Sequence, residues 1–350
     1  MSSAPASLTV IAEGVERRLR ALLETEIERW KALDPEIVAP LESLGALLLA
    51  GGKRLRPAFC HWGFVGAGGD PDDPVVADAG AAFELLHAFA LIHDDVMDGS
   101  STRRGVRTAH LEYATRHALG EWRGEARRFG EGVAILMGDL AFVYADQFLP
   151  ASNAEAMAVW HELRIELNVG QYLDIVGTAR AQTNRVAAER IARYKSGKYT
   201  VERPLHLGAA LAGRFGVLAR GLSAYGLPLG DAFQLRDDML GAFGESALTG
   251  KPVGDDLREG KPTPMLAIAA SRAGKQHAEL LHRVGAPDLD EDEVAALQAV
   301  IVDTGAQAEA EEAITALTEQ AVRAIAEASV TTAARDELID LAYYVAWRQR

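Results

Sequence analysis

Three aspartates close an apolar segment that has the pattern of a helix. Asp94 and Asp98 stand one helical turn apart on the same face, and Asp95 flanks them. Clustered carboxylates are costly to keep charged unless cations join them. Mg2+ binds carboxylate oxygens together with the oxygens of substrate phosphates. The cluster therefore predicts a magnesium site for a phosphorylated substrate; a solvated acidic helix face is the simpler alternative.

Basic residues occur close to this cluster and in one earlier segment. Arg103 and Arg104 follow the acids, and their guanidinium forks suit a diphosphate. Residues 51–57 (GGKRLRP) place Lys53 and Arg56 beside glycines that let the backbone approach a ligand. This segment lacks the spacing and the final Ser or Thr of a Walker P-loop. Acids and bases together predict metal-assisted diphosphate chemistry, although a basic turn between helices is the simpler explanation for residues 51–57.

A second acidic pair lies in the other half of the chain. Asp237 and Asp238 end another apolar helix, three residues after Gln234. Two helices that each deliver acids to one end could build a metal site in the core of a bundle. Isolated candidates are weaker, because a single histidine is more often a core residue and a single lysine more often lies on the surface. These candidates are His87, Lys195, Lys251 and Lys261.

The bulk composition limits the classes of function. The chain has 350 residues, of which 49% are apolar and 25% charged, as in ordinary globular proteins. The net charge of −14 argues against nucleic acid or an anionic membrane surface as the main partner. The single cysteine, Cys60, excludes an intramolecular disulfide and a cysteine-based zinc site. No signal peptide is evident and the uninterrupted apolar runs are short, so we expect a cytoplasmic protein without a membrane span.

Helical periodicity dominates the chain, and strand-like alternation is almost absent. Glycine and proline cluster at residues 66–71, 120–130 and 244–264, and we expect residues 120–130 to form a mobile loop. No long linker is present, which predicts one all-α domain over residues 1–350, a helical bundle with a central helix surrounded by others. The predicted helices are Thr9–Ala32, Pro35–Ala50, Pro57–Gly66, Val75–Asp98, Gly132–Phe148, Ala154–Val176, Ala187–Tyr199, Val201–Ala212, Gly216–Met239, Pro264–Ala273, Lys275–Val284, Glu291–Thr304 and one from Ala306 to near the end.

Five segments, in this order, resemble the motifs of the trans-isoprenyl diphosphate synthases, the polyprenyl synthetase family. They are GGKRLRP at 51–57, ELLHAFALIHDDVMDGSSTRRG at 84–105, GQYLD at 170–174, YKSGKYT at 194–200, and FQLRDD at 233–238 continuing to TGKPVGDDLREGK at 249–261. The resemblance covers most of the chain. It implies an all-α isoprenoid synthase fold with helices around a central cavity, working as a homodimer on isopentenyl diphosphate and an allylic diphosphate.

The resemblance also implies a role for individual residues. The ligands of three Mg2+ ions would be Asp94, Asp95, Asp98, Asp237, Asp238 and Asp256, with Asp94 and Asp98 serving two ions and Asp237 the third. Isopentenyl diphosphate would be held by Lys53, Arg56, His87 and Arg104, and the allylic diphosphate by Arg103, Lys195, Lys251 and Lys261. Gln234 and the Lys195–Ser196 backbone would stabilise a carbocation, with Gln171 and Asp174 supporting their neighbours.

This inventory suits the ionisation of an allylic diphosphate. Ionisation leaves a pyrophosphate rich in negative charge, and metal ions with fixed cations stabilise it most as it departs. The double bond of isopentenyl diphosphate then attacks the allylic cation, and we expect pyrophosphate to accept the proton that is lost. No nucleophilic side chain is required.

The second acidic motif departs from the fullest family pattern, because its third acid is replaced by Gly241. Glu245, one turn further on, is a candidate to compensate. The spacing of Asp237, Gly241 and Glu245 also raises a class I terpene cyclase as a rival, although a cyclase has no second diphosphate for residues 51–57 to hold. A non-catalytic subunit of a hetero-oligomeric synthase is a third class, and it would normally lack one of the metal motifs.

Product length depends on the residues just before the first motif. Phe89 lies roughly 7 Å along a helix from Asp94, and Ala90 follows it. An aromatic followed by a small residue resembles the short-motif geranylgeranyl diphosphate synthases. We therefore expect the twenty-carbon product, made from a dimethylallyl, geranyl or farnesyl primer. A farnesyl or longer-chain synthase is the alternative.

Overall fold

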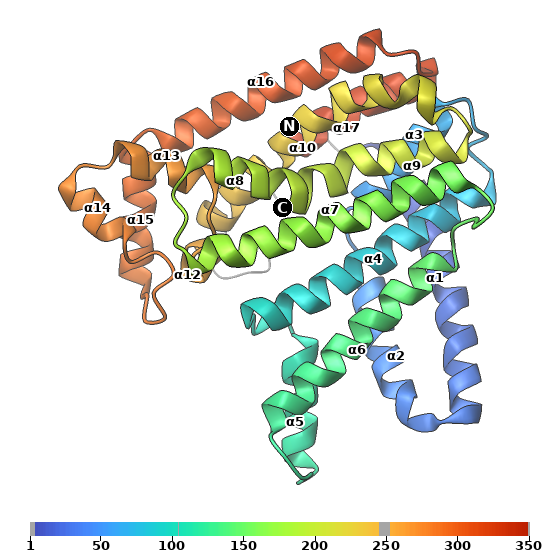
Figure 1. Ribbon diagram of the computed structural model, residues 1–350, viewed down its shortest axis with the longest axis horizontal. Coiled ribbons are helices and arrows are strands. Elements are labelled where there is room, and N and C mark those ends of the chain that lie inside the picture. The colour runs from blue at the N-terminus through green and yellow to red at the C-terminus, as the bar shows by residue number, and fades with distance from the viewer. Residues whose placement is uncertain (1–3, 104, 245–252, 349–350) are drawn as a thin grey trace. The chain divides into compact units, whose positions relative to one another are not determined.

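The computed structural model describes residues 4–103, 105–244 and 253–348. Helices dominate this part of the chain, as Figure 1 shows, and the strands described in it form one short hairpin. The predicted all-α class is therefore confirmed. Contacts divide the chain into two compact units: unit 1 comprises residues 1–5, 62–69 and 154–350, and unit 2 comprises residues 6–61 and 70–153. A single domain over residues 1–350 stays a prediction.

Unit 2 is built around one long apolar helix, α4 (Pro74–Asp98). Asp73 caps its first turn by accepting from the backbone N–H of Val75, Pro74 occupies the first helical position, and Gly99 ends it in the left-handed conformation with φ 68°. The other elements of unit 2 are α1 (Ala6–Leu33), η1 (Pro35–Ile37), α2 (Val38–Leu49), the first half of α3 (Leu55–Gly66), β1 (Thr102–Arg103), β2 (Val106–Arg107), α5 (Ala109–Leu119) and α6 (Ala126–Asp146).

By length and composition, α4 is long and apolar enough to cross a membrane, which a search for uninterrupted apolar runs misses. However, 61% of its most apolar window is buried in the protein. Its buried face includes Phe83, Leu85 and Leu86, all fully buried. This burial is typical of the core helix of a globular unit, because a lipid-facing helix would expose these side chains.

Unit 1 is built around α10 (Phe215–Phe243). This helix packs against α16 (Ala306–Glu327) and α17 (Thr332–Ala346), and also against η2 (Arg193–Glu202) and α9 (Arg203–Leu211), which precede it in the chain. Figure 1 shows α16 running alongside α10. The remaining elements of unit 1 are α7 (Ala154–Ala179), α8 (Arg185–Ala192), α12 (Asp255–Glu259), α13 (Pro264–Arg272), α14 (Lys275–Leu281) and α15 (Glu291–Asp303).

Several local predictions are wrong. Residues 109–119 form α5, and α6 already begins at Ala126, so residues 120–130 are only partly a loop. The hairpin β1–β2 was not expected, because two residues per strand are too few to show alternation. The long C-terminal helix is two helices, with a break at residues 328–331 where Thr331 caps α17.

Candidate active site

The first acidic motif ends α4 in unit 2. Asp98 is exposed, Asp94 is half-buried and Asp95 is buried. The hairpin β1–β2 turns Arg103 back onto the helix end, where its Nε donates to Asp95 Oδ1 at 2.8 Å and its Nη2 lies 3.8 Å from Asp94 Oδ2. Thr108 fixes this hairpin by donating from Oγ1 to the carbonyl of Ser100 at 2.8 Å. Arg103, a predicted ligand of the diphosphate, thus contacts Asp94 and Asp95, two predicted ligands of the metal ions.

Burial raises the pKa of Asp95, and the neighbouring Asp94 charge adds to this, whereas the Arg103 guanidinium opposes it. The net direction is upward, so neutralisation by Arg103 is incomplete. A carboxylate that is buried and only partly compensated gains from a further cation, and this agrees with the prediction of a metal site at this helix end.

In the basic segment 51–57, Arg54 has a structural role, whereas Lys53 and Arg56 remain the predicted ligands. Arg54 is buried, has a φ of +48° and forms ion pairs with Glu84 and, at 3.3 Å, with Glu16. Its Nη2 also donates to the carbonyl of Leu48 at 2.7 Å. Arg54 therefore ties the turn to α2 and α4. Lys53 lies on the same turn and Arg56 in the first turn of α3; both predicted ligands of isopentenyl diphosphate are half-buried.

The second acidic motif ends α10 in unit 1. Asp237 is half-exposed, whereas Asp238 is buried and accepts from Nε2 of Gln234 at 2.7 Å. Burial, and then the nearby Asp256 charge, raise the pKa of Asp238 well above its usual range. Its Oδ2 has no hydrogen-bond partner among the described residues. A buried carboxylate oxygen without a partner fits a site that is completed by a cation.

Gly241 explains the missing third acid. A Cβ at Gly241 would lie 1.9 Å from Oδ2 of Asp256, so the Asp256 carboxylate fills the space where a side chain at this position would begin. Asp256 comes from the short helix α12, and Lys261 Nζ lies 3.7 Å from its Oδ1. Glu245, the expected compensating acid, lies outside the described residues. The structure thus brings a third carboxylate to α10 from another segment.

Arg348 is a charged neighbour of this motif that sequence reasoning missed. Its Nη2 donates to Asp237 Oδ1 at 2.5 Å, and its side chain is 1% exposed. The residue follows α17, about a hundred residues after Asp237, so no spacing signal connects the two. Only the burial of a lone arginine at the end of an amphipathic helix could have suggested an acidic partner.

Lys195 lies on η2, a π-helical segment, and its Nζ donates to Asp174 Oδ2 of α7 at 2.6 Å. The backbone of η2 is held very closely by the helices on either side. A Cβ at Gly170 of α7 would lie 2.4 Å from the backbone nitrogen of Lys195, and one at Gly230 of α10 would lie 2.6 Å from the carbonyl oxygen of Gly197. The glycines Gly170 and Gly230 therefore allow α7 and α10 to pack directly on the π-helical backbone that carries Lys195. Such π-helical turns are frequent at functional sites.

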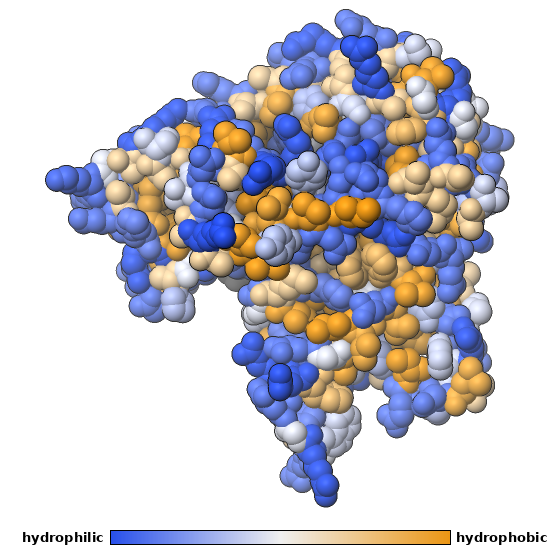
Figure 2. All heavy atoms as spheres, viewed as in Figure 1, coloured by the Kyte–Doolittle hydropathy of each residue, from blue (hydrophilic) through white to orange (hydrophobic). Residues whose placement is uncertain are grey.

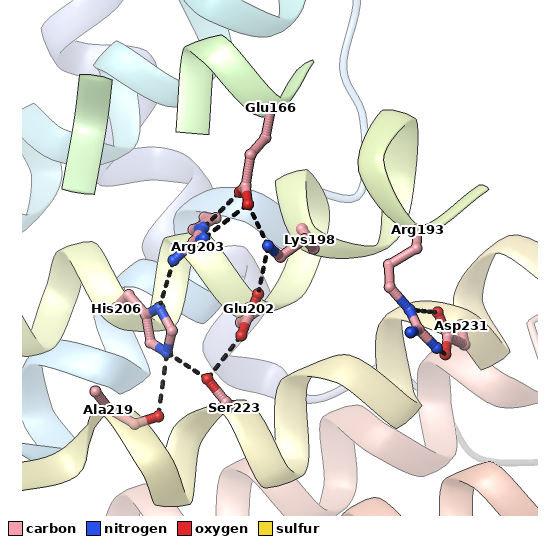
Figure 3. Close-up of polar contacts among 9 residues, drawn as sticks. All are labelled: Glu166, Arg193, Lys198, Glu202, Arg203, His206, Ala219, Ser223 and Asp231. Atoms are coloured by element: carbon pink, nitrogen blue, oxygen red, sulfur yellow. Dashed lines mark hydrogen bonds and ion pairs between the residues drawn. The ribbon is translucent and has the colours of Figure 1, made fainter. Parts of the chain in front are cut away.

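A polar network supports the far end of η2 (Figure 3). Glu166 of α7 accepts from Arg203 at 2.6 and 2.8 Å and forms an ion pair with Lys198. Burial by itself raises the pKa of Glu166, but Arg203 and Lys198 outweigh it and the net direction is downward. The charged form of Glu166 thus joins α7 to Lys198 in the middle of η2 and to Arg203, the first residue of α9.

The same network ends at His206 of α9. Its Nδ1 lies 3.3 Å from Nη1 of Arg203, and its Nε2 lies 3.2 Å from the carbonyl oxygen of Ala219 and 3.1 Å from Ser223 Oγ (Figure 3). A neutral ring that accepts at Nδ1 and donates from Nε2 satisfies both sides. Burial lowers the pKa of His206 to about 4, which keeps the ring neutral at physiological pH.

The remaining predicted site residues are distributed over both units. Arg104 and Lys251 lie outside the described residues. His87, Phe89 and Ala90 lie on α4, Gln171 on α7 and Ser196 on η2, and all five are half-buried. Within the described ranges no three Asp, Glu, His or Cys side chains converge closely enough to hold a metal ion by themselves. Asp95, Asp237 and Asp256 face an arginine or a lysine instead. Mg2+ commonly takes one or two carboxylates, with substrate phosphates and water completing its shell.

Comparison with known proteins identifies the family. The model of the polyprenyl synthetase family matches residues 39–301, which is most of the chain. The chain belongs to the polyprenyl synthetase family. This polyprenyl synthetase is 31% identical to the geranylfarnesyl diphosphate synthase of Aeropyrum pernix over 84% of this chain and 89% of that protein. It is 32% identical to the (2E,6E)-farnesyl diphosphate synthase of Mycobacterium tuberculosis over 85% and 80%, respectively.

Solved structures agree with this assignment. The geranylgeranyl pyrophosphate synthase of Corynebacterium glutamicum, complexed with isoprenyl diphosphate and magnesium, superposes with a TM-score of 0.92 at 36% identity, covering 98% of this chain and 99% of that one. The isoprenoid synthase fold is therefore shown, and this polyprenyl synthetase is a trans-prenyltransferase that elongates prenyl chains.

Proposed function

We propose that this polyprenyl synthetase is a Mg2+-dependent geranylgeranyl diphosphate synthase that condenses isopentenyl diphosphate with an allylic diphosphate. One observation carries the proposal. At each acidic helix end, a cation assigned to the diphosphate lies beside a carboxylate assigned to the metal: Arg103 on Asp95 in unit 2, and Lys261 near Asp256 in unit 1. Such paired sets suit a ligand that combines divalent metal ions with a diphosphate.

The residues of this chain supply binding and electrostatic stabilisation. Arg103, Lys195 and Lys261 would donate to the allylic diphosphate, which leaves with the electron pair of its C1–O bond. Lys53 and Arg56 would hold isopentenyl diphosphate, whose double bond forms the new carbon–carbon bond before a proton is lost. Gln234 donates from Nε2 to Asp238 at 2.7 Å, so its amide oxygen is the atom that would stabilise the cation.

The donor set fits magnesium. Asp94, Asp95 and Asp98 supply hard oxygen ligands in unit 2, and Asp237, Asp238 and Asp256 supply them in unit 1. Among the described residues, the buried Oδ2 of Asp238, which has no hydrogen-bond partner, is the observation that best fits a bound cation. Three bound Mg2+ ions would neutralise the departing pyrophosphate and so favour ionisation.

The twenty-carbon product is favoured by two residues of α4. The Phe89 ring packs on Phe142 of α6 with centroids 4.8 Å apart, and on His93 at 4.6 Å, so the aromatic is held in place. Ala90, the next residue of α4, carries only a methyl group. The similarity to the Corynebacterium glutamicum geranylgeranyl pyrophosphate synthase supports the same product. Relatives with fifteen- and twenty-five-carbon products have comparable identity, so product length needs a direct test.

The reaction is tested by incubating the protein with isopentenyl diphosphate, Mg2+ and dimethylallyl, geranyl or farnesyl diphosphate in turn. Pyrophosphate release that requires both substrates, with geranylgeranyl diphosphate as the final product, is the expected result. Consumption of an allylic diphosphate alone would identify a cyclase and contradict the proposal. A reaction that ends at fifteen or twenty-five carbons would keep the elongation activity and reject the assigned product.

Ala90→Phe tests the determinant of chain length. A second ring beside Phe89 should fill the space for the growing chain and shift the main product from twenty to fifteen carbons, as product chromatography would show. Ala90→Ser, which keeps the residue small, is the matched control and should leave the product unchanged. If Ala90→Phe also gives the twenty-carbon product, the determinant lies elsewhere.

We also propose that the protein is a cytoplasmic homodimer and that residues 1–350 form one polyprenyl synthetase domain. The support for a dimer is a row of exposed apolar side chains along one face of α7: Ile165, Val169, Tyr172 and Ile175, which are 58%, 43%, 67% and 43% exposed. Figure 2 shows hydrophobic side chains gathered in a row over α7. Such a stripe is typical of a protein interface. Sedimentation velocity of the purified protein measures the dimer directly.

A further inference from the structure

The end of α17 brings a buried positive charge to the second acidic motif. Arg348 Nη2 donates to Asp237 Oδ1 at 2.5 Å and to the carbonyl of Phe233 at 3.0 Å, and Nη1 donates to the carbonyl of Val345 at 2.5 Å. The guanidinium also lies over the Phe233 ring, 4.1 Å from its centroid. The Arg348 side chain is only 1% exposed, and these contacts hold its guanidinium in a fixed position beside Asp237.

A second arginine, Arg236 of α10, also holds the end of α17 against α10. Arg236 of α10 donates from Nε to the carbonyl of Ala346 at 2.7 Å and forms two hydrogen bonds with Glu311 of α16, at 2.8 and 2.7 Å. Ala346 is fully buried. The end of α17 is therefore held on α10 independently of Asp237, so Arg348 stays in place whatever binds to that carboxylate.

The charge of Arg348 opposes a metal ion at Asp237. The guanidinium takes one oxygen of Asp237, while the side chain as a whole remains 43% exposed and can still accept a ligand. A divalent ion on the same carboxylate would be repelled by the fixed guanidinium. A diphosphate would offset this penalty, because its negative charge would attract both cations and its oxygens could complete the metal's shell.

We infer that Arg348 makes metal binding at Asp237 conditional on a diphosphate. This inference rests on the proposed function, which places a metal ion at Asp237. By linkage, the factor by which a diphosphate tightens metal binding equals the factor by which the metal tightens the diphosphate. Arg348 is thus a positioning residue that couples the two ligands, so that the third ion joins the site together with its substrate.

The test is a titration of the full-length protein with Mn2+, whose free ion is counted by electron paramagnetic resonance, with and without inorganic pyrophosphate. The Mn2+ binding that Asp237→Asn weakens or abolishes identifies the ion held at Asp237. Arg348→Gln and Arg348→Met remove the charge, and methionine keeps apolar packing over Phe233 if glutamine impairs folding. Arg348→Lys keeps the charge. Arg323→Gln, which removes a 68% exposed arginine of α16, is the matched control.

Without pyrophosphate, either neutral variant should bind this Mn2+ about tenfold more tightly than the unmodified protein, and the enhancement by pyrophosphate should shrink by the same factor. Arg348→Lys and Arg323→Gln should behave like the unmodified protein. In the Asp237→Asn background, Arg348→Gln should have no further effect.

Two different failures can be told apart. If neutral variants bind Mn2+ with unchanged or weaker affinity in the absence of pyrophosphate, Arg348 does not oppose the metal and the inference is wrong. If the unmodified protein shows no Mn2+ binding that depends on Asp237 even with pyrophosphate, the proposed metal site at this motif fails as well.

Discussion

The two acidic helix ends, of α4 and of α10, each gather three carboxylates and a cation, but they take these residues from different parts of the chain. In unit 2, all three carboxylates come from the last turn and a half of α4, and Arg103 reaches them from a hairpin that follows directly in the chain. In unit 1, α10 supplies Asp237 and Asp238, whereas the third carboxylate comes from α12 and a cation comes from beyond α17. The first motif is local, and the second is assembled from three segments.

The difference predicts how each motif tolerates damage. The local motif takes all three of its carboxylates from a single helix, α4. The assembled motif shares its charge among Asp237, buried Asp238 and Asp256, so the loss of one ligand is partly offset by the others. It depends instead on close packing at the point where α12 meets α10.

The largest expected effect is that of Asp94→Asn. Removing a ligand from the local motif should lower kcat about a thousandfold, whereas Asp237→Asn in the assembled motif should lower it about a hundredfold. Pyrophosphate release at saturating substrates measures both. Asp72→Asn, at an exposed acid of unit 2, is the control and should retain full activity. Equal losses at Asp94 and Asp237 would show that the two motifs do not differ in this respect.

The same contrast explains what could be predicted from the sequence. The first motif and its arginine lie within ten residues, so helical spacing alone indicates a shared face for Asp94 and Asp98. From the sequence, Gly241 suggests that the motif has lost its third acid. Residues near Gly241 in the chain do not show that the Asp256 carboxylate occupies the space beside it. No spacing in the sequence connects Arg348 with Asp237, since the two residues are 111 positions apart.

Secondary structure followed the same rule. Long apolar helices such as α4 and α10 were predicted with nearly correct bounds, because their periodicity extends over many turns. The hairpin β1–β2 and the π-helical turns of η2 were not, since both depend on tertiary contacts. In η2, those contacts are the close approaches at Gly170 and Gly230.

Gly241→Ala tests whether close packing sustains the assembled motif. Its Cβ would lie 1.9 Å from Oδ2 of Asp256, so the carboxylate must move away from α10. We expect kcat to fall about fiftyfold with a raised Mg2+ requirement, measured as pyrophosphate release against Mg2+ concentration.

A paired substitution serves as the control for this prediction. Asp256→Ala should also be impaired, and Gly241→Asp combined with Asp256→Ala should recover part of the lost activity, because it returns the third acid to α10 in the space that Asp256 vacates. If Gly241→Ala is fully active, or the double variant is no better than Asp256→Ala, Asp256 does not stand in for the third acid.

The smallest expected effect concerns stability, and it compares one histidine from each unit. Burial lowers the pKa of His206 in unit 1 and of His61 in unit 2 to about 4. Between this value and the unfolded value near 6.5, the unfolded chain binds a proton that the folded chain does not, so the free energy of unfolding falls as the pH is lowered and levels off below about pH 4. From pH 7 to pH 5, His206 alone should account for a loss of about 2 kcal/mol.

His206→Gln should reduce this dependence, and denaturant unfolding at pH 7, 6 and 5 measures it. The change in slope is the readout, because the substitution also alters the bonds to Arg203 and Ser223 and lowers stability at every pH. His61→Gln removes the corresponding contribution of unit 2 without touching the network of Figure 3. If only one of the two substitutions flattens the profile, acid sensitivity belongs to one unit. An unchanged slope in both would mean that neither ring is held neutral by burial.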